Sequence, residues 1–349
     1  IRYRLSAGYT FTDGVLVTNK DEFVRKNING FISADVTSWL TQEATFSYAR
    51  SKSTLPSSAL GAIYSTRLPS FYPEGTMPAE IEEQSAGVPF FTSYNQIQWS
   101  NASRSLNSNP RIFLRSIIKP FKNFDVNVEY TYDRKDYDYS WYTGSQKYTT
   151  VQGGVDTTPT LDYLQKQKST TNYNAFNIYG TYRLDILKDH HFKFMAGFNQ
   201  ESSSYDDMVD TSYGQAVIEV PSLGGGTSTL IAKDNYSDYS VRGGFFRVNY
   251  NYASRYLLEV NGRYDGSSKF PKDNRYGFFP SVSAGWNIAE ESFMKATRKW
   301  LDGLKLRASY GMIGNQNISP YAFVPTMTIN NKYSGWLIDG RVPTHCVPI

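Results

Sequence analysis

Hydrophobic and polar residues alternate along this chain with a period of two, in runs of nine or more residues. In residues 1–10, for example, Tyr3 and Leu5 alternate with Arg2 and Arg4. Successive side chains of a β-strand point to opposite faces of a sheet, so each run predicts a strand with one apolar and one polar face. The chain is therefore expected to be all-β.

The same pattern recurs through the whole chain. Four further clear runs have the apolar faces Phe124-Val126-Val128-Tyr130-Tyr132, Phe192-Phe194-Ala196-Phe198, Leu258-Val260-Gly262-Tyr264 and Leu304-Leu306-Ala308-Tyr310-Met312. Weaker runs lie near 27–37, 40–50, 110–118, 173–185, 240–251 and 276–288. Together with the first run, these segments predict eleven strands.

The connections between the predicted strands alternate in length. Short ones lie at Ser38-Trp39, Lys119-Pro120-Phe121-Lys122, Lys188-Asp189-His190 and Ala253-Ser254-Arg255, and long ones at 11–26, 51–109, 138–172, 200–239 and 266–275. An antiparallel up-and-down transmembrane β-barrel has this layout, with short periplasmic turns and long extracellular loops. A soluble sandwich or a propeller gives no reason to place every long loop at one end.

The strand length and the chemistry of the two faces agree with a barrel in a membrane. About 9–11 residues cross a bilayer as a tilted strand, whereas soluble strands average about 5–6. No stretch approaches 18 consecutive apolar residues, so a transmembrane helix is excluded. The apolar face is expected to meet lipid, and tyrosines near the strand ends to form an interfacial girdle. The polar faces are expected to contact a plug or water; they include Arg2, Arg4, Glu129, Arg183, Arg247, Glu259, Arg263 and Arg307.

One segment departs from the strand pattern. Residues 290–301 open with acidic Glu290 and Glu291 and close with basic residues, as the helix macrodipole prefers. Phe293, Met294, Trp300 and Leu301 recur at helical spacing, so this segment predicts a short structural helix in a periplasmic turn.

The sequence shows no catalytic, metal or cofactor constellation, and we predict that the protein is not an enzyme. His190 and His191 would point to opposite faces of a strand, and the single cysteine, Cys346, excludes a disulfide or thiolate zinc site. Gly224-Gly225-Gly226-Thr227 lacks the lysine of a phosphate-binding loop. The net charge of +4 is not clustered, which argues against nucleic-acid binding.

Four aromatic residues in the predicted loops are candidates for ligand contact. They are Trp99, Trp141, Tyr142 and Tyr321. Their rings could stack on sugars, and packing of loop against loop accounts for them equally well.

The C-terminal half contains recognisable segments. Tyr264-Asp265-Gly266-Ser267-Ser268-Lys269-Phe270, Arg275 to Trp286, Glu291-Ser292-Phe293-Met294, and Trp300 to Gln316 resemble the SusC/RagA-type TonB-dependent outer-membrane transporters of Bacteroidetes. The match is contiguous from 264 to 316, whereas the middle of the chain matches in layout more than in residues.

This resemblance implies a 22-stranded barrel with an internal plug that imports an oligosaccharide or a peptide. It also implies two partners, a SusD-like surface lipoprotein and the inner-membrane TonB–ExbB–ExbD complex, which acts through a TonB box and the plug. Eleven strands are about half of such a barrel. Residues 1–349 show no signal peptide, plug, TonB box or closing strand, so we expect a partial barrel domain of a longer protein.

Two other functions remain open at this point. A passive, plug-free porin would share the strand and loop pattern, and a plug encoded directly upstream would decide against it. A secreted β-sheet protein that binds glycans would also alternate, but it should be soluble without detergent. A glycoside hydrolase needs two facing carboxylates about 5–10 Å apart, and no such pair stands out.

Overall fold

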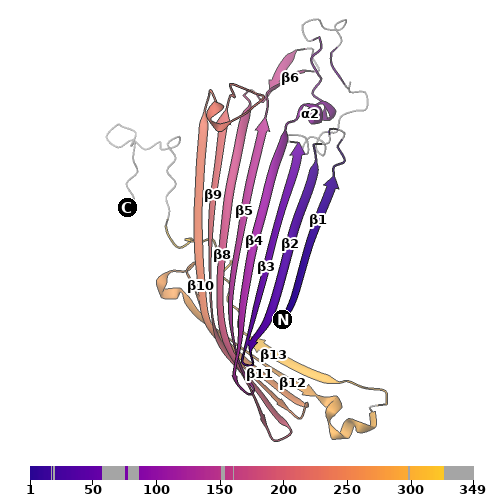
Figure 1. Cartoon of the computed structure of the whole chain (residues 1–349), viewed down its shortest axis with the longest axis vertical. Coiled ribbons are helices and arrows are strands. Elements are labelled where there is room, and N and C mark those ends of the chain that lie inside the picture. Colours follow the sequence, from indigo (N-terminus) through magenta and orange to yellow (C-terminus); the bar gives the residue numbers. More distant parts are fainter. Residues whose placement is uncertain are drawn as a thin grey trace, which may run out of the picture.

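The computed structural model describes residues 1–16, 18, 20–56, 75–77, 86–150, 154–159, 161–297 and 299–325. Within them, eleven antiparallel strands form one sheet in the order β1-β2-β3-β4-β5-β8-β9-β10-β11-β12-β13 (Figure 1). These strands are β1 Arg2–Asp13, β2 Glu22–Thr37, β3 Leu40–Pro56, β4 Ala102–Phe121, β5 Phe124–Thr143, β8 Tyr163–Ile186, β9 His190–Tyr213, β10 Leu230–Tyr252, β11 Tyr256–Ser267, β12 Tyr276–Asn287 and β13 Lys305–Gly311. The predicted up-and-down order is confirmed, since each strand of the sheet pairs with the next.

The strands are longer than the hydrophobic pattern predicts. β8 and β9 each contain 24 residues, and β10 contains 23. The expected loops 138–172 and 200–239 therefore consist largely of strand, and the limits predicted for the long loops were wrong. Alternation of apolar and polar residues marks only the part of a strand that has lipid on one face. Beyond that part both faces are polar, so the strand continues without a hydropathy signal.

An apolar band occupies the outward face of the sheet. On β8 it runs from Phe176 to Ile186, within the length that a bilayer requires. Phe46, Phe194 and Phe246 belong to the same band and remain 38–44% exposed. Five hydrophobic side chains of the described residues are buried, far fewer than a soluble sheet of this size needs. The sheet thus turns its hydrophobic residues outward, toward lipid.

Tyrosines mark the edge of this band nearest the long loops. The hydroxyl of Tyr130 donates to Asn174 at 2.8 Å, and that of Tyr132 donates to Asn172 at 3.5 Å. Each ring thus lies on the apolar side and each hydroxyl meets a polar side chain, as at a membrane interface.

The short turns lie at the other end of the sheet, at the bottom of Figure 1. Three of them contain non-glycine residues with positive φ: Asn123 at 68°, Leu187 at 55°, and the adjacent Ala253 and Ser254 at 49° and 59°. The turns at 38–39 and 253–255 lie where they were predicted. The β4–β5 turn is shifted to 122–123, because β4 continues through Phe121 after a register irregularity, and the β8–β9 turn at 187–189 begins one residue before its predicted position.

The predicted helix at 290–301 was wrong in type. The segment forms two 3₁₀ helices, η4 Ile288–Glu290 and η5 Ser292–Thr297, and Phe293 and Trp300 are 64% and 74% exposed. A segment this short cannot sustain an α-helix without packing of its apolar face. None of the helices in the described ranges is long and apolar enough to span a membrane.

Smaller elements lie at the long-loop end. They are helix α2 Ser93–Trp99, the hairpin β6 Gln146–Thr149 with β7 Val155–Thr158, and the 3₁₀ helices η2 Leu223–Gly225 and η3 Lys272–Asn274. The sequence analysis missed α2, whose N-cap Thr92 accepts a hydrogen bond from the Asn95 amide at 3.1 Å.

Candidate functional site: the polar inner wall

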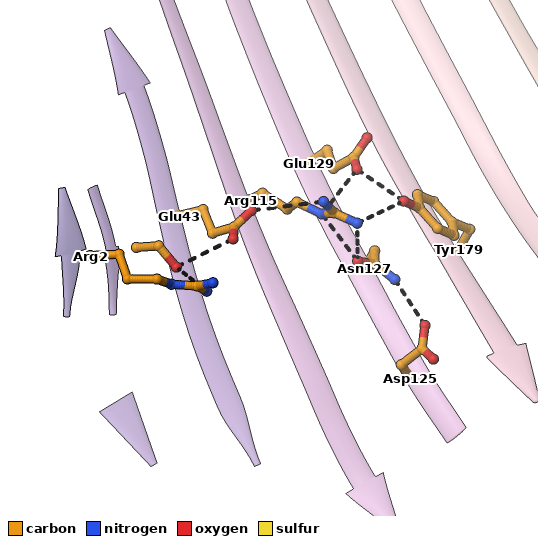
Figure 2. A network of polar contacts seen from close by, with 8 residues as sticks. Arg2, Glu43, Arg115, Asp125, Asn127, Glu129 and Tyr179 are labelled. Atoms are coloured by element: carbon orange, nitrogen blue, oxygen red, sulfur yellow. Dashed lines mark hydrogen bonds and ion pairs between the residues drawn. The ribbon is translucent and has the colours of Figure 1, made fainter. Parts of the chain in front are cut away.

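The polar face of the sheet carries a connected network of charged side chains (Figure 2). Arg115 of β4 lies 3.4 Å from Glu129 of β5 and 3.7 Å from Glu43 of β3. It also donates to the Asn127 side-chain oxygen at 2.9 and 3.1 Å. One guanidinium therefore joins three strands.

The strand register explains why these residues meet. Glu43 lies directly opposite Arg115, and Arg115 lies directly opposite Glu129. Cross-strand partners share a face, so opposite charges at these three positions fall next to one another. At the edge of the network Ser33 accepts from Arg2 at 3.1 Å and donates to Glu43 at 3.3 Å.

The same face remains polar in the second half of the sheet. Asn249 and Asn261 donate to Glu259 at 2.6 and 2.9 Å, and Arg263 pairs with Asp265 at 2.9 Å. A hollow of about 870 Å³ lies on this face, lined in part by Glu259, Asn261 and Arg263. The polar face is therefore concave there, as the inner wall of a barrel would be.

The pairing places every predicted polar residue on this inner face. The set comprises Arg2, Arg4, Glu129, Arg183, Arg247, Glu259, Arg263 and Arg307. Arg183 pairs with Asp125 at 2.8 Å, near the short-turn end. Whether these residues contact a plug or water stays a prediction.

The four candidate loop aromatics do not form one site. Among the described residues no ring contact joins any two of them. Trp99 lies 6.3 Å from the Phe91 ring, and the Tyr321 hydroxyl donates to Asp238. Tyr142 and Trp141 are strand residues that point to opposite faces of β5.

The surroundings of Tyr142 indicate a structural role for its side chain. Its side chain is buried, and its hydroxyl donates to Asp162 at 2.9 Å. Burial raises the pKa of Tyr142 to about 12, with the hydrogen bond to Asp162 adding to the effect. The hydroxyl therefore stays protonated at neutral pH and holds the β5–β8 connection.

Trp141 instead belongs to a run of aromatic rings that the sequence analysis missed. Its ring lies 6.3 Å from Tyr139 and 6.0 Å from Tyr163, and the run continues to Tyr137 and Tyr213 at spacings of 6.1 and 5.6 Å. On β5, Tyr137, Tyr139 and Trp141 lie an even number of residues from Glu129, so their rings face inward as Glu129 does. The sequence feature that could have predicted this run is the aromatic residue at every second position of Tyr137-Asp138-Tyr139-Ser140-Trp141.

The other sequence candidates have separate surroundings. The His190 ring lies 4.8 Å from the Tyr252 ring and is tilted by 49° to it, whereas His191 lies 2.6 Å from Asp185. His345 and Cys346 lie outside the described residues. Within the described part of the chain, no three His, Cys, Asp or Glu side chains gather as metal ligands would.

Known proteins share this sequence and this fold. A family model described as "TonB dependent receptor-like, beta-barrel" matches residues 81–335. The TonB-dependent receptor P26 of Formosa agariphila is 32% identical over 240 residues, which cover 64% of this chain and 23% of that protein. The TonB-dependent receptor SusC of Bacteroides thetaiotaomicron is 47% identical over 91 residues, which cover 26% of this chain and 9% of SusC.

A solved structure agrees with the fold. The RagAB peptide importer in its "open-open" state superposes with a TM-score of 0.71 at 21% identity, over 94% of this chain and 36% of that one. The chain thus spans about a third of that barrel protein and less than a quarter of receptor P26. The family model covers well over half of this chain, which also has an outward apolar band and a polar inner wall. The chain accordingly belongs to the TonB-dependent receptor β-barrel family of the outer membrane, whose members are transporters and not enzymes.

Proposed function

We propose that the protein containing this chain imports a nutrient across the outer membrane with energy supplied through TonB. The observation that carries the proposal is the pairing of an outward apolar band with a continuous charged inner wall, in a chain of this family. Lipid requires the first feature, and a hydrated path or a polar plug requires the second.

The ligand that we propose is an oligosaccharide or a peptide, captured together with a SusD-like surface lipoprotein. The similarity to SusC and to the RagAB peptide importer supports this class. The inward aromatic run supports it as well, because extended polar ligands stack on tyrosine and tryptophan rings.

Uptake measured in the native bacterium tests this function. Fluorescently labelled oligosaccharide and peptide pools are offered to cells that carry the full-length gene, a gene deletion, or a deletion of the TonB box. Energised import predicts that both deletions abolish accumulation while surface binding survives loss of the TonB box.

A passive porin predicts a different result. The purified full-length protein would then conduct ions in planar bilayers without TonB, and loss of the TonB box would leave uptake unchanged. Either outcome would overturn active import.

A further inference from the structure

Basic residues lie on the outward face of β2 and β3 near the long-loop edge of the apolar band, where only Val24 of β2 and its partner Phe11 of β1 continue the apolar residues farther out. On β2 the outward residue Ile28 is followed by Lys26, and on β3 Tyr48 is followed by Arg50. The register places Lys26 directly opposite Arg50, and both side chains are exposed. Two cations thus lie side by side on the outward face, near the long-loop edge of the apolar band.

This pair is unfavourable without an anion. Like charges directly opposite each other on a sheet are destabilising. Within the described ranges, no salt bridge involves Lys26 or Arg50, whereas the next outward cation, Lys52, pairs with Glu22 at 3.6 Å. Among the described residues, Lys26 and Arg50 thus lack the carboxylate partner that Lys52 has.

An aromatic ring lies beside the Lys26 ammonium on the outer surface. The Lys26 ammonium lies 6.0 Å from the centroid of the Tyr9 ring, at the edge of cation–π range. Tyr9 is the residue opposite Lys26 on β1, so the ring lies beside the ammonium on the outer surface. The position of the charge is thus set by the sheet.

We propose that Lys26 and Arg50 together bind a phosphate group of an anionic lipid in the outer leaflet. A guanidinium presents paired N–H donors that match two phosphate oxygens, and an ammonium adds a point charge. A phosphate between Lys26 and Arg50 attracts both cations and so offsets the repulsion between them. The place of the pair on the lipid-facing side of the sheet, near the outer edge of the apolar band, favours a lipid headgroup over a soluble anion. This inference rests on the outer-membrane location and is independent of the imported ligand.

Thermal unfolding of the full-length protein in neutral detergent tests the proposal. The wild type and the double variant Lys26→Gln/Arg50→Gln are compared alone and with added bisphosphorylated lipid A. Without lipid, the double variant is expected to be at least as stable as the wild type, because the repulsion is gone. With lipid A, the Tm of the wild type is expected to rise by several degrees, and this rise is lost in the double variant.

Three controls separate the possible sources of the effect. Lys52→Gln, on the same face of β3 but paired with Glu22, should keep the full response to lipid A. Dephosphorylated lipid A should stabilise neither protein. Inorganic phosphate at the same concentration should not reproduce the rise.

The proposal is overturned if the double variant responds like the wild type, or if Lys52→Gln loses as much as the pair does. It is also overturned if dephosphorylated lipid A or inorganic phosphate acts as well as lipid A. Should the double variant fail to fold, the single variant Arg50→Gln and the lipid phosphate that copurifies with it, counted by native mass spectrometry, provide the same comparison.

Discussion

At the scale of single residues, Arg115 carries the largest share of the inner network. Its guanidinium serves Glu43, Glu129 and Asn127 at once. Replacement by Gln removes the cation between the Glu43 and Glu129 carboxylates, which are 18% and 16% exposed. The two negative charges then lie near each other without the cation, and each carboxylate loses an ion-pair partner. We expect Arg115→Gln to lower the free energy of unfolding by about 1–2 kcal/mol.

Urea unfolding of the full-length protein in lipid vesicles measures this effect. Arg25→Gln is a matched control, because Arg25 lies on the same inner face and forms no salt bridge with another described residue. Equal destabilisation by both variants would show that the network contributes nothing beyond its individual charges.

Glu291 predicts a dependence of stability on pH. Its side chain is buried in the turn after β12 and accepts from the Tyr256 hydroxyl at 2.7 Å and the Trp286 indole N–H at 3.0 Å. These hydrogen bonds, Tyr256 first, together with Arg255 lower the pKa of Glu291. A lowered pKa means that the carboxylate stabilises the fold above its unfolded pKa, and that this stabilisation is lost as the pH falls through the folded pKa.

The expected result is that acidification from neutral pH narrows the stability gap between the wild type and Glu291→Gln. Thermal unfolding between pH 7 and the acid range follows the two proteins side by side. A gap that stays constant across this range would mean that the charge of Glu291 is not what stabilises the turn. The carboxylate belongs to the Glu291-Ser292-Phe293-Met294 segment that carries the family resemblance.

At the scale of the element, β5 offers a direct test of which face meets lipid. Phe124, Val126 and Val128 alternate with Asp125, Asn127 and Glu129. Single cysteines are introduced at these positions in a full-length background that carries Cys346→Ala. A membrane-impermeant thiol reagent should label the second set in a plug-deleted protein and should leave the first set unlabelled. The reverse pattern would show that the sheet is oriented inside out.

The sequence predicted the strands best where lipid imposes a chemical contrast. Phe124 to Tyr132 alternate cleanly with polar residues, and β5 begins at the predicted position. The outer part of β8 escaped detection, because both of its faces meet water and Lys166 and Gln167 are both polar. Hydrogen bonding to β5 and β9, which a single sequence does not show, keeps that part extended.

For the candidate site, the sequence predicted on which face of the sheet each residue lies, but not which residues contact one another. Alternation alone placed Glu129 and Arg263 on the inner wall. The meeting of Glu43 with Arg115 depends on the register of two strands separated by a long connection, which no local pattern encodes. The aromatic run through Tyr163 and Tyr213 depends on register in the same way.

At the scale of the whole molecule, the sheet formed by the described residues has two open edges. β1 and β13 each pair on one side only, and nearly all of their residues are exposed. Unpaired strand edges are not tolerated in hydrocarbon. We expect residues 1–349, produced alone and refolded in detergent, to aggregate or pair through these edges.

Heat-modifiable migration on SDS gels reports a closed barrel and serves as the readout. The full-length protein is the positive control and should show a compact unheated band. A compact, monomeric band from residues 1–349 alone would contradict this expectation, because it would require β1 and β13 to pair with each other.

The height of the wall has a consequence for how a solute reaches the protein. Strands β8 and β9 contain 24 residues each, whereas the bilayer occupies roughly half of that length. A molecule approaching from outside thus enters a compartment with firm sides before it arrives at the plane of the lipid. Those sides are hydrogen-bonded sheet, in which β8 and β9 are each paired on both edges, so we expect them to move less than the loops above them. In a closed barrel, a solute too wide to pass between these walls would be excluded before it reached the level of the lipid.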